Sequence, residues 1–177
     1  VIAELFKPLA DNLRIRFSIE IPDTPLMLWI DRRKMEIVVV NLLYNAFKYS
    51  RRGIGEVHLS YEEQQQSATI SVEDNGIGIA MDEQTRIFER FYQARNNDSA
   101  QKSVGIGLAL AKHIVTLHHG EIEVESELNV GSLFRVRIPK GYGHLAPGQI
   151  KDTDEVPDKP LWNLPTTIES ELSLTKD

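Results

Sequence analysis

Residues 31–50 have the sequence DRRKMEIVVVNLLYNAFKYS and predict the helix around which the fold is built. Asp31 is a favourable N-cap residue, and Gly53 follows the last apolar position, so we expect the helix to run from Asp31 to about Tyr49. Its apolar residues recur at helical spacing and predict one buried face. They are Met35, Val38, Val39, Leu42, Leu43, Ala46 and Phe47.

Two asparagines interrupt this apolar helix. Asn41 and Asn45 are four residues apart and therefore share a face, and Lys48 lies about one turn further on. Asparagine in a helix interior competes with the backbone for hydrogen bonds and needs partners. The pair could be buried amides that bond to neighbouring loops. Alternatively, their oxygens could coordinate a hard cation such as Mg²⁺ while Lys48 meets an anion.

The remaining pattern predicts strands that alternate with helices. Strands are expected at 14–21, 26–30, 56–61, 68–72, 121–126 and 132–138, and further helices at 82–91 and 106–118. The economical packing places about three helices on one face of a mixed or antiparallel sheet. We therefore expect an α+β fold, a two-layer α/β sandwich.

The chain has two glycine-rich stretches: one follows a predicted strand, and the other opens a predicted helix. Residues 74–79 are DNGIGI, where glycine would let a ligand approach the backbone and Asp74 could accept from a flat ligand's amino group. The same letters also make an ordinary turn. Residues 105–108 are GIGL and open a helix, where exposed N–H groups favour phosphate. Neither a P-loop nor G-x-G-x-x-G is present.

Composition excludes several classes of protein. The 177 residues are 41% hydrophobic and 26% charged, which is ordinary for a globular chain. No cysteine is present, so disulfides and thiolate metal sites are excluded. The net charge of −6 disfavours nucleic-acid binding, and the short apolar runs predict no direct membrane contact. Because the chain begins at Val1, we expect it to be a piece of a longer protein.

The last 38 residues differ in composition from the rest. Residues 140–177 contain four lysines, seven acidic residues and half of the eight prolines. We expect a domain at 1–139, followed by an acidic, proline-containing linker or extension at 140–177. A segment around Leu161 and Trp162 that docks on a partner is the alternative.

The order of the motifs resembles that of sensor histidine kinases. The stretches NLLYNAFKYS (41–50), DNGIGI (74–79), IFERFYQ (87–93) and GIGLALAK (105–112) are similar to that family's N, G1, F and G2 boxes. VGSLFRVRIP (130–139) is similar to its late glycine-serine turn. The resemblance covers residues 1–139, implies the Bergerat fold, and is closest in character to hybrid sensor kinases, which carry a receiver domain further on.

The resemblance implies a role for each matching residue in binding ATP and Mg²⁺. Asn45 would hold Mg²⁺, Asn41 would lie beside the triphosphate and its metal, and Lys48 would contact phosphate; these three would form the catalytic group. Asp74 would accept from the adenine amino group. Tyr49, Gly76, Gly78 and Ile79 would border the nucleotide.

The F and G2 boxes would flank a lid over the nucleotide. Phe88 and Phe91 would pack beneath that lid, although both could equally be core residues. The lid would span about 93–104, and its cations Arg95 and Lys102 would be the candidates to touch the γ-phosphate. The phosphates would be bound at the start of the following helix by Gly105, Ile106, Gly107 and Leu108.

The residue at position 41 separates this chain from hydrolytic relatives on the same fold. Type II topoisomerases, heat-shock chaperone ATPases and mismatch-repair ATPases place a glutamate base there, and an amide cannot take up a proton usefully. We therefore expect transfer of the γ-phosphoryl group to a histidine on a separate domain. A non-catalytic nucleotide-binding regulator is the alternative, and a kinase of protein serine or of mitochondrial dehydrogenase type is a more distant one.

The resemblance also implies partners and a location. The expected partners are an upstream dimerisation and phosphoacceptor helical hairpin and a response-regulator receiver domain. We expect the fragment to be monomeric, the parent to be a homodimer, and this part to be the cytoplasmic domain of a membrane-anchored bacterial sensor.

The histidines of this chain predict the outcome of an autophosphorylation assay. None of His58, His113, His118, His119 and His144 stands in the H-[ED]-x-x-x-P pattern of a phosphoacceptor. His118 and His119 are near a helix end, where histidine complements the dipole. The isolated chain should therefore form no phosphohistidine with labelled Mg-ATP. An acid-labile label on the isolated chain would contradict this expectation.

Overall fold

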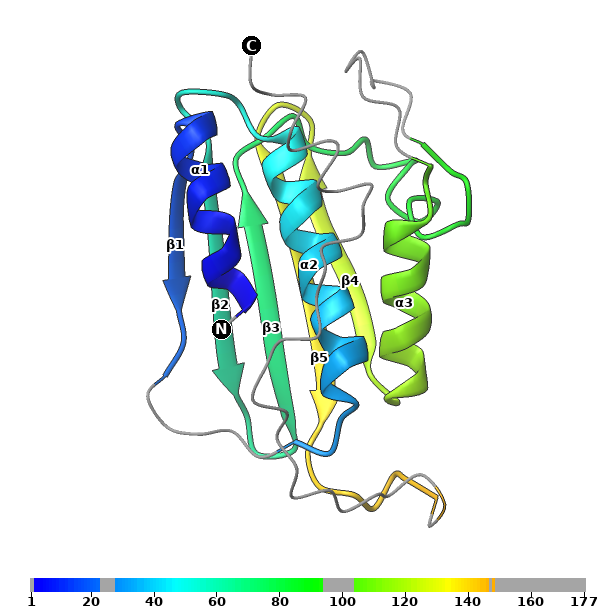
Figure 1. Cartoon of the computed structure of the whole chain (residues 1–177). Helices are drawn as coiled ribbons and strands as arrows, with labels where there is room; N and C mark the ends of the chain where they lie inside the picture. The colour runs from blue at the N-terminus through cyan, green and yellow to red at the C-terminus, as the bar shows by residue number, and fades with distance from the viewer. Residues whose placement is uncertain (1, 23–27, 94–103, 147, 149–177) are drawn as a thin grey trace.

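A computed structural model describes residues 2–22, 28–93, 104–146 and 148, and it consists of one sheet with helices on one face (Figure 1). The helical elements are the 3-10 helix η1 (Ile2–Phe6) and the α-helices α1 (Lys7–Leu13), α2 (Arg32–Tyr49) and α3 (Gly107–Leu117). The strands are β1 (Arg16–Glu20), β2 (Glu56–Glu63), β3 (Ser67–Asp74), β4 (Glu121–Glu127) and β5 (Gly131–Pro139). The predicted two-layer α/β sandwich is confirmed.

The sheet is mixed, with strand order β1-β2-β3-β5-β4. β1 pairs in parallel with β2, and the other neighbours are antiparallel. Along β4 every second side chain is exposed, in the order exposed, half-buried, exposed, as expected for a strand with one covered face. The open face carries cross-strand ion pairs such as Arg16–Glu56 and Arg135–Glu125.

The core lies between α2 and the covered face of the sheet. The helix begins where the Asp31 side chain accepts from the Lys34 backbone N–H at 3.1 Å, as the sequence predicted. Its buried residues are Met35, Val38, Val40, Leu42, Leu43, Ala46 and Phe47. They meet the inward residues of the central strands, among them Val57, Val72 and Val136.

The N-terminal helix α1 was not predicted. It follows η1 directly and is too short to show a clear helical period. Phe6, just before α1, stacks on Phe47 of α2 with ring centroids 5.6 Å apart, and Phe17 of β1 meets the same ring edge-on at 5.2 Å. These aromatic contacts hold the N-terminal elements against the core.

Two predicted elements are wrong. Residues 82–91 form consecutive turns: the backbone N–H groups of Glu83, Arg86 and Glu89 each bond three residues back, and that of Ile87 bonds four residues back. The expected strand at 26–30 is not a strand over its described part, 28–30, and residues 26 and 27 lie outside the described residues. Leu28 and Ile30 instead pack against the core, and Trp29 contacts the Tyr142 ring at 5.7 Å.

The segment just after β5 returns toward the sheet and helices. The Lys140 backbone N–H donates to the Gln66 carbonyl at 2.9 Å, and its ammonium pairs with Glu63. Leu161 and Trp162 lie outside the described residues, so the division into 1–139 and 140–177 stays a prediction. In the described part of the chain, no helix is long and apolar enough to cross a bilayer.

Candidate functional site

The two long helices bring the asparagine pair and the second glycine-rich stretch together. α2 and α3 lie side by side and run in opposite directions (Figure 1). Gly107, the first residue of α3, lies so close to α2 that a Cβ there would be 2.4 Å from the Asn41 Oδ1. The Asn41 Nδ2 donates to the Ile37 carbonyl at 2.8 Å, which leaves Oδ1 facing the start of α3. A side chain at position 107 would displace the Asn41 amide, whereas glycine leaves room for it.

Asn45 and Lys48 follow Asn41 along the same side of α2. Asn45 is half-buried, and its side chain makes no hydrogen bond to another described residue. The Lys48 ammonium lies 5.4 Å from the centroid of the Tyr49 ring. These residues thus place an amide oxygen and a cation within two turns of the N-terminus of α3, a location that suits an anion with a bound cation.

Asp74 ends β3 and is buried, with 7% of its surface exposed. The Gly76 backbone N–H donates to its Oδ1 at 2.8 Å. Burial raises the pKa of Asp74 to about 6, while backbone hydrogen bonds from Gly76 and Ser132 oppose that rise and the neighbouring Glu73 adds to it. A buried carboxylate of this kind is a strong, orientation-specific acceptor.

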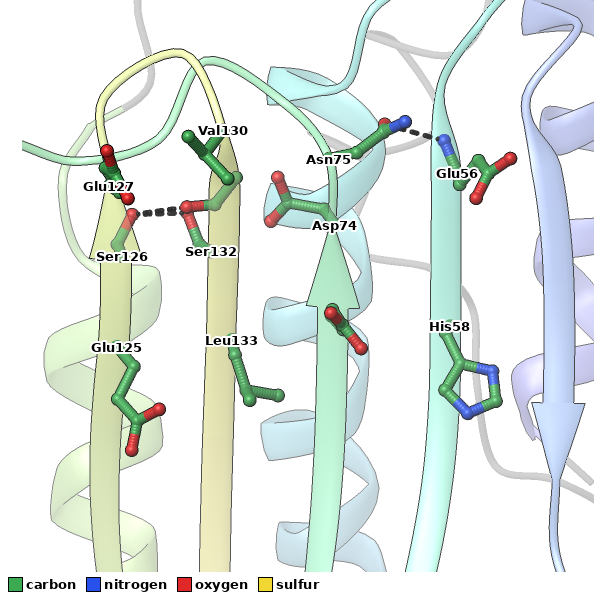
Figure 2. A pocket seen from close by; sticks show the side chains of 12 residues that line it. Glu56, His58, Asp74, Asn75, Glu125, Ser126, Glu127, Val130, Ser132 and Leu133 are labelled. Carbon is green, nitrogen blue, oxygen red and sulfur yellow. Dashed lines mark hydrogen bonds between the residues drawn. The ribbon is translucent and has the colours of Figure 1, made fainter.

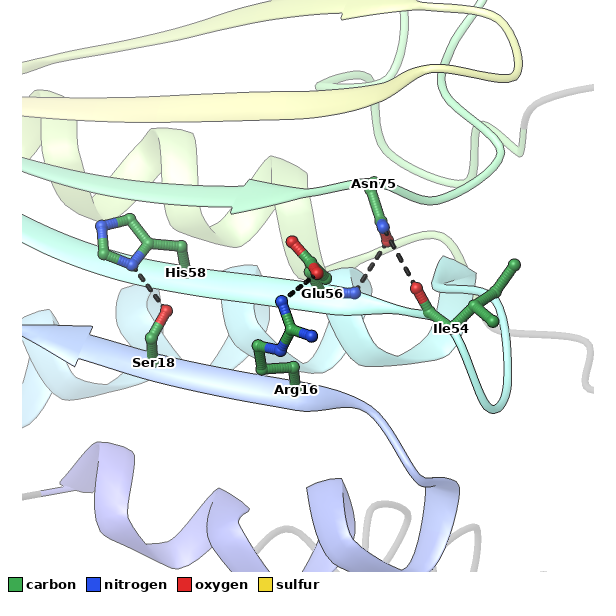
Figure 3. A network of polar contacts seen from close by, with 6 residues as sticks. All are labelled: Arg16, Ser18, Ile54, Glu56, His58 and Asn75. Carbon is green, nitrogen blue, oxygen red and sulfur yellow. Dashed lines mark hydrogen bonds and ion pairs between the residues drawn. The ribbon is translucent and has the colours of Figure 1, made fainter.

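The turn after Asp74 packs on the C-terminal end of α2. The Ile77 backbone N–H donates to the Tyr49 carbonyl at 3.2 Å, so the first glycine-rich stretch and the asparagine helix meet. The Asn75 side chain accepts from the Glu56 backbone N–H at 2.8 Å and donates to the Ile54 carbonyl at 3.2 Å (Figure 3). Asn75 therefore ties this turn to β2, beside the Arg16–Glu56 ion pair.

The far side of the same turn contacts the β4–β5 hairpin. Gly78 has φ +66°, and a Cβ on it would lie 1.9 Å from the Glu127 carbonyl oxygen, so the position requires glycine. The Ile79 backbone N–H donates to the Ser126 hydroxyl at 2.8 Å, and the Gln84 side chain donates to the Ser126 carbonyl at 2.7 Å. Ser126 and Gln84 were not predicted, because no local pattern links them to residue 79.

The two aromatic residues of the third motif behave differently. Phe88 is half-buried and meets Phe134 edge-on at 6.4 Å, with the Lys112 ammonium 5.2 Å from its ring centroid. Phe91 is 70% exposed and has φ +66°, and its backbone N–H donates to the Gly105 carbonyl at 2.9 Å. This bond joins the two ends of the predicted lid. Arg95 and Lys102 lie outside the described residues.

A second contact near Phe91, at the start of the predicted lid, was not predicted. The Tyr92 hydroxyl donates to the Glu83 carboxylate at 3.0 Å, and Glu83 is buried. The Arg86 guanidinium lies 4.5 Å from the centroid of the Tyr92 ring. The sequence gives no signal for this contact, because Asp82 and Glu89 in the same stretch are also acidic.

The open face of the sheet carries a separate groove of about 620 Å³ (Figure 2). Its walls include the carboxylates Glu56, Glu73, Glu125 and Glu127, and Asp74 and Ser132 border it. In Figure 2 the helices lie behind the strands, so this groove is on the face of the sheet that the helices do not cover. Because these carboxylates are negatively charged, the groove would repel a polyanion such as a triphosphate.

The chain resembles known proteins in sequence. A family described as histidine kinase-, DNA gyrase B- and HSP90-like ATPase matches residues 30–142. The sensor histidine kinase RppB of Synechocystis is 39% identical over 140 residues, which are 78% of this chain and 30% of that protein. The alginate biosynthesis sensor protein KinB of Pseudomonas aeruginosa is 38% identical over 134 residues, which are 76% of this chain and 22% of that protein. The chain thus spans less than a third of either relative.

Solved structures agree with the sequence relatives. The catalytic domain of histidine kinase ThkA has a TM-score of 0.69 and 26% identity, covering 78% of this chain and 89% of that one. Full-length ShkA in complex with AMPPNP has a TM-score of 0.69 and 27% identity, covering 79% of this chain and 28% of that one.

The buried Asp74 predicts how stability changes with pH. Its pKa is higher in the folded chain than in an exposed carboxyl, so folding favours the protonated form. Its contribution is full below about pH 4 and is lost as pH rises through about 6, by about 3 kcal/mol in all. The free energy of unfolding of the parent, relative to Asp74→Asn, should therefore fall by that amount between pH 4 and pH 8.

Urea denaturation at several pH values measures this difference. Asp82→Asn is the matched control, because Asp82 is exposed, and its difference from the parent should not change with pH in this way. If the free energies of unfolding of the parent and of Asp74→Asn changed in parallel from pH 4 to pH 8, the pKa of Asp74 would not be raised.

Proposed function

We infer that this chain, which belongs to the histidine kinase-, DNA gyrase B- and HSP90-like ATPase family, is the ATP-loading domain of a sensor histidine kinase. It is an ATP-binding domain of the histidine kinase kind by family and by fold. Our proposal adds that it binds Mg-ATP and passes the γ-phosphoryl group to a histidine on another domain. The meeting of Asn41 with the start of α3 is the observation that carries the proposal.

The residues at that meeting point fit a magnesium triphosphate. Oxygen ligands suit Mg²⁺, and Asn45 would supply one from α2. Lys48 and the first backbone N–H groups of α3, from Gly107 onward, would bind phosphate oxygens, since the positive end of an eleven-residue helix favours anions. Mg²⁺ would neutralise charge on the triphosphate, and the chain would contribute orientation and further positive charge.

Asp74 would select the base. It lies at the end of β3, beside the turn that contacts the end of α2 at Tyr49. An adenine amino group could donate to its carboxylate, whereas a base without that donor would leave a buried acceptor unpaired. Gly76, Gly78 and Ile79 would border the base, and Tyr49 would lie between base and phosphates.

The chemistry at position 41 favours transfer over hydrolysis. The Asn41 amide donates to Ile37 and cannot act as a proton acceptor for water. The nearest preceding acid on α2, Glu36, pairs with Arg32 at 3.1 Å. Because no carboxylate is at the position of a general base on α2, a separate nucleophile is the better acceptor. A purely regulatory nucleotide-binding domain is not favoured, since the relatives and solved structures that the chain matches are named as histidine kinases.

The whole protein would contain more than this chain. We propose an upstream helical hairpin that dimerises and carries the acceptor histidine, and a receiver domain as the next acceptor. The catalytic unit would be residues 1–139, on the cytoplasmic side of a membrane-anchored bacterial sensor. Phe88 and Phe91 would pack beneath a lid at about 93–104, and Arg95 and Lys102 would be the candidates to touch the γ-phosphate.

Loss of Asn45 tests the metal site. Asn45→Ala should remove the gain in ATP affinity that Mg²⁺ gives the parent, roughly tenfold or more, because the metal loses an oxygen ligand. Calorimetric titration with ATP, with and without Mg²⁺, measures this gain. Asn12→Ala on α1 is the matched control and should keep it. If folded Asn45→Ala kept the full increase in ATP affinity with Mg²⁺, Asn45 would not be a metal ligand.

Loss of the Asp74 carboxylate tests base selection. The parent should bind ATP more tightly than GTP, and Asp74→Asn should weaken ATP binding roughly tenfold or more because the full acceptor is gone. Glu73→Gln, a change at the exposed neighbouring residue on β3, should leave ATP affinity as it is. Equal affinity of the parent for ATP and GTP would be evidence against an adenine role for Asp74.

A further inference from the structure

His118 connects α3 to the start of α2. It is the C-cap residue of α3 and is buried, with 8% of its surface exposed. Its Nδ1 lies 2.8 Å from the Ile114 carbonyl oxygen of its own helix. Its Nε2 lies 3.0 Å from the backbone nitrogen of Asp31, the N-cap residue of α2 and 87 positions earlier in the sequence. One imidazole thus links the ends of two helices.

The two contacts are compatible with one form of the ring. The Asp31 backbone N–H can only donate, so Nε2 must accept, and the Ile114 carbonyl can only accept, so Nδ1 must carry the proton. The other neutral tautomer would break both bonds, and the imidazolium would break the bond to Asp31. His118 is therefore held as the neutral Nδ1–H tautomer, a more specific role than complementing a helix dipole.

This link is at the opposite end of the helix pair from the nucleotide. α3 begins at Gly107, against Asn41, and its eleven residues down to His118 span about 16 Å. Between these points, the buried residues of α3 are the apolar Ala111, Ile114 and Val115, whose contacts are less directional than a hydrogen bond. The contact between Gly107 and Asn41 involves no side chain of α3, because glycine has none. The hydrogen bond from the Asp31 backbone N–H to His118 adds a directional contact that restrains α3 along its axis against α2.

We propose that His118 is a positioning residue for nucleotide binding, which it serves by fixing α3 against α2. This role rests on the proposed function, because the groups it aligns are Asn45 and Lys48 on α2 and the first N–H groups of α3. A shift of α3 along its axis would move the phosphate-binding N–H groups away from the metal ligand. His118 touches neither the phosphates nor the metal in this arrangement.

Two amide substitutions separate positioning from simple capping. Gln places an amide oxygen near the position of Nε2, so His118→Gln keeps an acceptor for Asp31. Asn places an amide nitrogen near Nδ1, so His118→Asn keeps only the bond within α3. Positioning predicts that Gln preserves Mg-ATP affinity and that Asn and Ala weaken it, roughly tenfold for the loss of one bond between helices.

A role in capping α3 alone predicts the opposite rescue, by Asn and not by Gln. His113→Ala, on the exposed side of α3, is the matched control and should bind as the parent does. All variants are compared at a temperature where circular dichroism shows each to be fully folded. Rescue by Asn, or unchanged affinity in folded His118→Ala, overturns the positioning role.

A spectroscopic measurement tests the hydrogen bonds without nucleotide. Nitrogen-15 shifts of the imidazole should show the neutral Nδ1–H tautomer in the parent chain, and the Asp31 amide should move on His118→Ala but not on His113→Ala. Observation of the other tautomer overturns the inference independently of any ligand. A parent that shows the expected tautomer but binds no Mg-ATP would instead overturn the proposed function, and the positioning role with it.

Discussion

The close approach of Gly107 to Asn41 is the constraint on which the site depends. It brings the backbone N–H groups at the start of α3 next to side chains of α2. α2 and α3 pack closely together, and the buried residues of α3 are Ala111, Ile114 and Val115.

The sheet holds the Asp74 carboxylate in position, as the helices hold the Asn45 side chain. Its carboxylate is buried because β3 is a central strand, flanked by β2 and β5. The turn that follows it has little freedom, since Asn75 bonds to β2, Ile77 to the end of α2 and Ile79 to the β4–β5 hairpin. A polar group in a low-dielectric position is costly, and this dense support keeps its single acceptor geometry in place.

The sequence predicted α2, the two hairpins and the order of the motifs, because each depends on local signals: an N-cap, a helical period and alternation. It did not predict α1, whose contacts through Phe6 and Phe17 with Phe47 join residues far apart in sequence. The helix expected at 82–91 failed because Glu83 bonds to Tyr92 and Ile87 is buried, so tertiary contacts decided the local backbone. Likewise, His118 could be placed at a helix end, whereas its partner Asp31 could not be inferred from spacing.

The alternation along β4 has a consequence for how the chain behaves at high concentration. β4 forms one edge of the sheet, and its exposed positions Glu121, Glu123, Glu125 and Glu127 are all acidic. An unpaired edge offers free backbone groups to a strand from another molecule, and many proteins protect such edges with charge. Two β4 edges that approached each other would bring two rows of glutamate together. Arg135 and Arg137 of β5 pair with Glu125 and Glu121, and the charge that remains on the two rows opposes edge-to-edge aggregation.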